Sequence, residues 1–164
     1  MSSVHEKDRE EIPALTKFRM LARDIDAEAT RIAANVVTKH YRFVIGVQLA
    51  NAANELAELA DESFEHYPSN ALAAYDRKRC YSEAVAKAKT VKRLANKAIK
   101  LKIGEGKAEP YKKLIADAGE FINIAHGLKK SVKIKGTGTV EDAIAWHKAQ
   151  IAALDELQSN DVAL

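Results

Sequence analysis

Apolar residues return every three or four positions over most of the chain, which is the spacing of a helix that buries one side. Over residues 71–102 the apolar positions step alternately by three and four, as in a coiled coil. No stretch shows the strict apolar–polar alternation of a half-buried strand. The pattern therefore predicts helices over residues 13–33, 41–64, 71–102, 108–133 and 139–158.

Proline and glycine separate these stretches. Pro13 fits the first turn of a helix, and Pro68 ends the second stretch because the residue before a proline avoids helical geometry. Gly104 and Gly106 stop the third stretch. We therefore expect a flexible N-terminus over residues 1–11, a helical domain over 12–134, and a linker with a C-terminal helix over 135–164.

The expected fold class is all-α, an antiparallel up-and-down four-helix bundle with an additional C-terminal helix. We expect this last helix to dock through an apolar stripe with Trp146 and Ile151 as anchors. Its acidic Asp155 and Glu156 would then lie over basic surface and weaken the attraction of that surface for anions.

The composition indicates the size class of the protein and the compartment in which we expect it. A chain of 164 residues that is 47% apolar and 30% charged is long enough for one globular domain. No apolar run is long enough to cross a membrane, and the N-terminus lacks the apolar core of a signal peptide. Cys80 is the only cysteine, so an internal disulfide is excluded. We expect a cytoplasmic protein.

Charge is distributed unevenly along the chain. Residues 1–76 carry a net charge of −5, residues 77–135 carry +12 and residues 136–164 carry −4, while the whole chain carries only +3. Such a basic middle segment indicates a nucleic-acid partner. The alternative is that acidic helices pack beside basic ones and cancel them.

Candidate catalytic and metal-binding motifs are missing. The sequence contains no Glu-x-x-His pair and no zinc-finger or metalloprotease spacing, and the neighbours Glu65 and His66 would not share a helix face. Three basic residues precede Cys80, but a structural cysteine is the simpler interpretation. We expect no enzymatic activity, no metal and no cofactor. The histidines are dispersed at His5, His40, His66, His126 and His147.

Lysines and arginines gather on the third predicted helix and the start of the fourth. Several lie three or four positions apart and share one helix face, which is typical either of a solvated surface or of a surface that binds phosphates. No aromatic residues alternate with them, so contacts to the nucleic-acid backbone are expected rather than base stacking. The candidate nucleic-acid-binding residues are Lys87, Lys89, Lys92, Arg93, Lys97, Lys100, Lys102, Lys112 and Lys113.

Two segments resemble the Avd-like (accessory variability determinant) four-helix bundle family of diversity-generating retroelements. The first is KHYRFVIGVQLANAANELAELADES, with a His–aromatic–Arg–Phe start and an Ile–Gly pair at residues 40–46. The second covers residues 84–132, with a turn, a tyrosine and an L-I-x-x-x-G-E pattern at residues 111–120. The chain departs from the family in AHGLKKSV, which replaces an aromatic-rich helix end, and in the extra residues 136–164.

The resemblance implies a non-catalytic, homopentameric protein that binds a reverse transcriptase and RNA or cDNA and supports mutagenic reverse transcription. It would place Tyr41 and Arg42 at a corner between protomers, with Gly46 allowing close approach of helices. One alternative is the similar helical bundle encoded in ribosomal RNA intervening sequences. A helical scaffold without nucleic acid is another, and an enzyme is the third.

Overall fold

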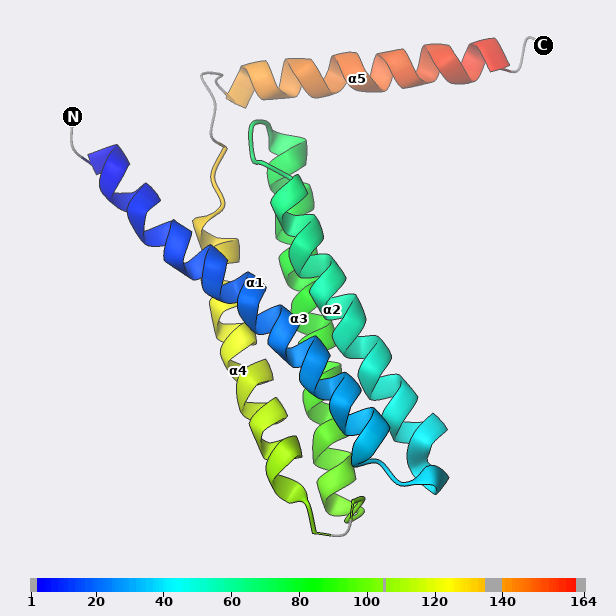
Figure 1. Ribbon diagram of the computed structural model, residues 1–164. Helices are drawn as coiled ribbons and strands as arrows, with labels where there is room; N and C mark the ends of the chain where they lie inside the picture. The colour runs from blue at the N-terminus through cyan, green and yellow to red at the C-terminus, as the bar shows by residue number, and fades with distance from the viewer. Residues whose placement is uncertain (1–2, 105, 135–139, 162–164) are drawn as a thin grey trace.

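The computed structural model describes residues 3–104, 106–134 and 140–161, which form helices joined by turns without a strand among them (Figure 1). The expected all-α class is thereby confirmed. No described helix combines the length and apolar character needed to cross a bilayer. The α-helices are α1 (Ser3–Asn35), α2 (Val47–Glu65), α3 (Ala71–Lys100), α4 (Ala108–Ser131) and α5 (Val140–Asp161).

Helices α1 to α4 lie side by side (Figure 1). Helix α3 packs against α2 and α4, and α1 packs against the same two helices, so the four helices share one core. Helix α5 lies across one end of this group, near the start of α3 (Figure 1).

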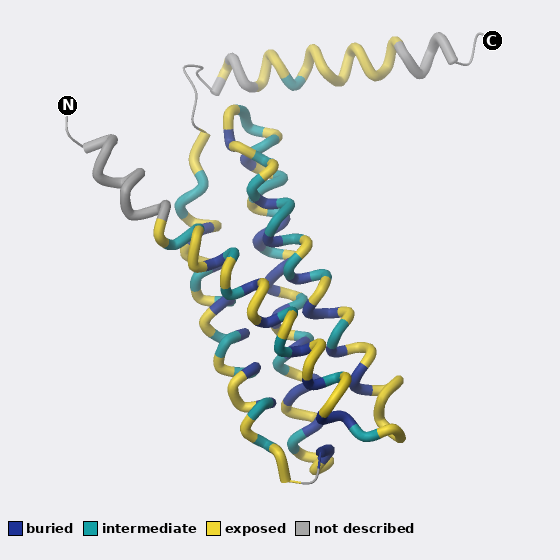
Figure 2. Tube along the Cα trace, viewed as in Figure 1, coloured by how far each residue is buried: buried dark blue, intermediate teal, exposed yellow. Residues whose placement is uncertain are grey.

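The core combines aromatic rings with small side chains, and Figure 2 shows buried residues recurring along all four helices. The ring of Phe18 stacks on that of Phe121 with 4.6 Å between centroids, and it meets the edge of Tyr81 at 5.4 Å. Alanines line much of the buried side of α3, which lets its neighbours approach closely. Those that are fully buried are Ala84, Ala88, Ala95 and Ala98.

Helix α1 begins at Ser3, well before the predicted start at Pro13, so Pro13 lies inside the helix. Proline lacks a backbone N–H but holds the φ angle of a helix, so the helix continues past it with the loss of one backbone hydrogen bond. The predicted flexible segment over residues 1–11 thus has a helical backbone from Ser3 onward, and its flexibility stays a prediction.

The start of α2 also differs from the expected continuous helix from Tyr41. A 3₁₀ turn spans Lys39–Tyr41, a π turn spans Arg42–Gly46, and the α-helix begins only at Val47. The N–H of Val47 bonds to the carbonyl of Arg42, five residues back, so the turn holds one residue more than an α-helical turn. Within this turn Phe43 and Val44 are exposed, whereas Ile45 is buried in the core.

Gly104 and Gly46 differ in whether the surrounding structure leaves room for a side chain. Gly104 ends the turn after α3 with φ at 94°, and a Cβ built there would lie 2.8 Å from Val36 Cγ1. Gly46 has helical angles, and a Cβ there would meet Val37 and Ala33 at 3.5 Å or more, which is ordinary contact. Close packing within this chain therefore requires glycine at position 104 and not at position 46.

We expect Gly104→Ala to destabilise the protein by about 2 kcal/mol or more, because left-handed geometry alone costs a side chain roughly 1–2 kcal/mol. Gly46→Ala should instead be neutral or stabilising by up to about 1 kcal/mol, since alanine favours a helix over glycine. Urea unfolding followed by circular dichroism measures both. A large loss of stability in the Gly46 variant would show that its ordinary contacts hide a steric requirement.

Helix α5 contacts the start of α3, where Ile151 and Leu154 line a hollow with Ala71 and Leu72, but the two predicted anchors both stay exposed, which corrects their predicted role. Trp146 is 44% exposed and Ile151 is 59% exposed. These two residues are five positions apart, which places them roughly 140° apart around a helix, so they cannot anchor to one surface together. The described hydrogen bond of α5 to α3 joins His147 Nε2 to the backbone N–H of Leu72, which donates at 2.8 Å.

Candidate nucleic-acid interface

Four of the predicted basic residues form an open row on the second half of α3, which we call the α3 basic face: Lys89, Arg93, Lys97 and Lys100. All four are exposed. Their spacing of three and four positions puts them on the side of α3 that faces away from its buried alanines. None of their side chains forms an ion pair or hydrogen bond with a residue that the structure describes.

Three of the other predicted lysines are paired with carboxylates. Lys87 forms an ion pair with Glu55 of α2. On α4, Lys112 Nζ lies 3.2 Å from Glu109 Oε1 and Lys113 Nζ lies 2.9 Å from Asp117 Oδ2. The hydrogen bond to Asp117 raises the pKa of Lys113. These lysines are partly neutralised by acidic neighbours, so we expect them to attract phosphate less than the unpaired residues do.

The remaining two predicted residues flank the α3 basic face. Lys92 is half-buried on the side of α3 that faces α4, where its Nζ would lie 3.7 Å from a Cβ built at Gly119. Lys102 is exposed in the turn after α3 and has a left-handed φ of 52°. They widen the basic surface at its edge and at its end.

The uneven charge distribution allowed two interpretations, a basic surface for nucleic acid or basic helices cancelled by acidic ones. The ion pairs show where each of them applies. Lys87 and Lys17 are paired with acids on neighbouring helices, Glu55 and Glu120, and Lys112 and Lys113 are paired within α4. The α3 basic face is directed outward and has no such described partner. Cancellation therefore applies to these paired lysines, while a strip of positive charge without a described acidic partner stays on the outside of α3.

The second candidate surface is the corner before α2. Tyr41 and Arg42 are exposed there, but Gly46 is buried against α1 and points away from solvent. Phe43 is 79% exposed and Val44 is also exposed, although the sequence-based prediction left both out of the candidate interface. The signal was present in the run YRFVIGV, since so many adjacent apolar residues cannot all lie on one side of a helix.

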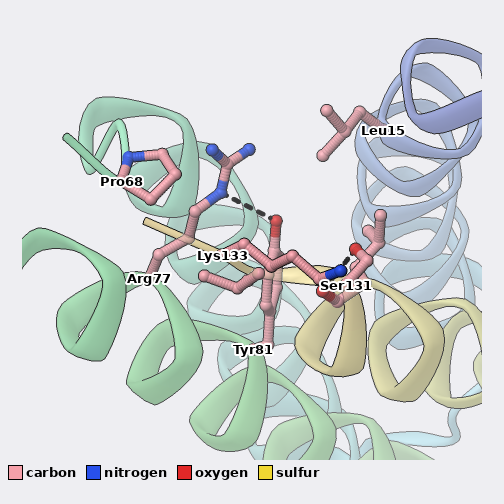
Figure 3. A pocket seen from close by; sticks show the side chains of 8 residues that line it. Leu15, Pro68, Arg77, Tyr81, Ser131 and Lys133 are labelled. Atoms are coloured by element: carbon pink, nitrogen blue, oxygen red, sulfur yellow. Dashed lines mark hydrogen bonds between the residues drawn. The ribbon is translucent and has the colours of Figure 1, made fainter. Parts of the chain in front are cut away.

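A small hollow lies near Leu15, Pro68 and Tyr81, where Arg77 Nε donates a hydrogen bond to Tyr81 Oη at 3.0 Å (Figure 3). Its volume of about 10 Å³ is about the room that a single water needs. It is too small for an organic substrate.

Helix α5 lies away from the α3 basic face, so we now expect deletion of residues 136–164 to change nucleic-acid affinity by less than about twofold. The contact of α5 with α3 is at Leu72, roughly 25 Å along the helix from Lys89. Salt screens charges beyond about 8–10 Å at ordinary ionic strength. Fluorescence anisotropy with labelled RNA tests this expectation. A clear rise in affinity after the deletion would restore a shielding role for Asp155 and Glu156.

Comparisons with protein-family models, with curated proteins and with solved structures found no match to this chain. The resemblance to the Avd-like family, which covers roughly residues 12–133, therefore rests on the segments 39–63 and 84–132 themselves.

Proposed function

We propose that this protein is a non-catalytic, cytoplasmic accessory protein of a diversity-generating retroelement that binds RNA or cDNA through the α3 basic face. The observation that carries the proposal is the row of four exposed basic side chains without a described acidic partner. The reverse transcriptase as partner comes from the resemblance to the Avd-like family.

The proposed fold is the antiparallel up-and-down four-helix bundle of that family. The packing of α1 and α3 each against both α2 and α4 supports this arrangement. In it, the long outer side of α3 is left free for a ligand while its inner side fills the core.

The dimensions of the α3 basic face suit a phosphate backbone. From Lys89 to Lys100 the helix rises roughly 16 Å, which corresponds to about five phosphates at 3.4 Å of axial rise per strand. Lysine and arginine bind phosphate oxygens through charge and hydrogen bonds, which carry no sequence information. Binding is therefore expected to favour no particular sequence.

We also propose that the protein assembles into a homopentamer. The exposed Tyr41, Phe43 and Val44 beside Arg42 offer an apolar corner of the kind that protein interfaces bury, with aromatic and arginine side chains together. Light scattering on the full chain tests the assembly. A monomer at all micromolar concentrations would remove the pentamer from the proposal.

Titration of the full chain with labelled single-stranded RNA and DNA at increasing salt tests nucleic-acid binding. We expect affinity to fall steeply with salt, with a log–log slope of about 0.7 per phosphate contacted on a single strand. Absence of binding at low salt would favour the alternative, a helical scaffold of the ribosomal intervening-sequence type without nucleic acid. Co-purification with a reverse transcriptase encoded beside the gene separates the retroelement assignment from nucleic-acid binding alone.

A further inference from the structure

Three side chains with metal-binding atoms converge between the end of α2 and the first half of α3. Glu62 lies in the last turn of α2, His66 follows that helix directly, and Cys80 comes from α3. One ligand atom from each residue lies within 4.8 Å of the other two. The site is independent of the α3 basic face, which lies farther along the helix.

The spacing of these atoms is close to that of a tetrahedral metal centre. Two ligands at zinc bond lengths of 2.0–2.3 Å are about 3.3–3.8 Å apart. His66 Nε2 and Glu62 Oε1 are 3.4 Å apart already, and Cys80 Sγ lies within 4.8 Å of a ligand atom of each of these two residues. Small side-chain rotations would therefore bring all three atoms onto one ion.

The three residues differ in burial, with Cys80 on the inner side of the site and Glu62 and His66 toward solvent. Cys80 is 0% exposed, whereas the side chains of Glu62 and His66 are 40% and 28% exposed. An ion can thus reach the carboxylate and imidazole from solvent, and these two side chains must turn for it to reach the covered sulfur of Cys80.

The surroundings of the site favour a cation. His66 caps the C-terminal end of α2, where the helix dipole is negative. Three carboxylates, those of Glu62, Asp76 and Glu83, lie around the single guanidinium of Arg79. Arg79 Nη1 lies 3.1 Å from Glu83 Oε1, so Arg79 keeps a partner when Glu62 turns toward an ion.

Without a metal, Cys80 is a neutral thiol. Burial and the nearby Glu62 carboxylate raise its pKa to about 11, so it is not the activated nucleophile that its basic sequence neighbours suggest. A divalent cation supplies the charge that a coordinating thiol needs to lose its proton.

We propose that Glu62, His66 and Cys80 bind Zn²⁺ and thereby fasten the end of α2 to α3. Thiolate, imidazole and carboxylate are the three ligand types that zinc takes from proteins, whereas Mg²⁺ and Ca²⁺ require oxygen ligands throughout. On binding, the thiol proton leaves to solvent, and the thiolate and carboxylate balance the two charges of the ion. Water fills the fourth position.

Part of this site was readable from the sequence. Glu62 and His66 are four positions apart, the spacing of residues that share a helix face, whereas the adjacent Glu65 and His66 do not have that spacing. Cys80 could not be added to them from sequence, because its position depends on how α3 packs against α2.

Titration of the metal-free full chain with Co²⁺ and then Zn²⁺ tests the proposal. We expect one Co²⁺ per chain, with tetrahedral d–d bands and a thiolate-to-metal charge-transfer band, and displacement by Zn²⁺. Cys80→Ala and Glu62→Gln should each weaken Zn²⁺ binding by at least about 100-fold, since loss of even an outer-shell partner costs 10–100-fold. The thermal unfolding midpoint of the parent should rise with Zn²⁺ concentration.

Glu65→Gln and His126→Gln are the matched controls, because Glu65 lies on the same helix as Glu62 and His126 is an exposed histidine on α4. Both should bind Zn²⁺ like the parent. Circular dichroism establishes that each variant is folded. If Cys80→Ala unfolds the core, Glu62→Gln still tests the site, because it changes only a half-exposed side chain. Absence of the charge-transfer band in the parent, or equal loss in Glu62→Gln and Glu65→Gln, would overturn the proposal.

Discussion

Simultaneous replacement of Lys89, Arg93, Lys97 and Lys100 by glutamine is expected to weaken nucleic-acid binding by roughly 10³-fold at about 0.1 M salt. Each phosphate neutralised contributes about 0.7–0.9 to the log–log salt slope, so four contacts account for roughly three orders of magnitude between about 0.1 and 1 M. The slope itself should shrink by about three. The fold should survive because glutamine has nearly the helix propensity of lysine and the four positions are exposed.

A charge-matched control distinguishes the α3 basic face from overall charge. Replacement of Lys17, Lys87, Lys112 and Lys113 by glutamine also removes four positive charges, but from side chains that are paired with carboxylates. This variant should keep most of the affinity and nearly the same salt slope. Equal weakening in both variants would show that net charge alone governs binding, and no weakening in either would make the α3 basic face an ordinary solvated surface.

Phe18→Ala is expected to destabilise the fold by about 3–5 kcal/mol, the range for removing a buried aromatic side chain. Phe18 is fully buried and contacts the rings of Phe121 and Tyr81, so its loss leaves a cavity among α1, α3 and α4. Urea unfolding measures the change.

Met20→Ala provides the comparison for Phe18→Ala on the same helix. Met20 is 60% exposed, and its removal should change stability by less than about 1 kcal/mol. If Phe18→Ala cost no more than Met20→Ala, the packing of the three rings would not be holding α1 against α3 and α4.

Helix content was predictable because it depends on local spacing. The stretch 71–102 became α3 over Ala71–Lys100, and 108–133 became α4 over Ala108–Ser131, since alternating buried positions and flanking glycines act within a few residues. The π turn over Arg42–Gly46 was not predictable in this way. It depends on how α2 meets α1, and both an α turn and a π turn accommodate the same local sequence.

The candidate site likewise has a part that could be predicted from the sequence and a part that could not. The row from Lys89 to Lys100 follows from helix geometry and was expected on one face. The pairing of Lys87 was not visible because its partner Glu55 lies on another helix, whereas the pairs of Lys112 and Lys113 follow from spacing within α4. The convergence of Cys80 with Glu62 and His66 was hidden for the same reason, since it arises from contact between helices rather than from spacing along the chain.

The π turn before α2 also bears on how this chain can vary in length. A turn closed by a bond from Val47 to Arg42 contains one residue beyond the α-helical repeat, so losing a single residue there leaves an ordinary α turn and an unchanged α2. Elsewhere in α1 to α4 such a deletion would rotate one part of the core against the rest. Loss of one residue at Phe43 or Val44 is therefore expected to be tolerated, because both are exposed, whereas Ile45 in the same turn belongs to the core and must keep its place.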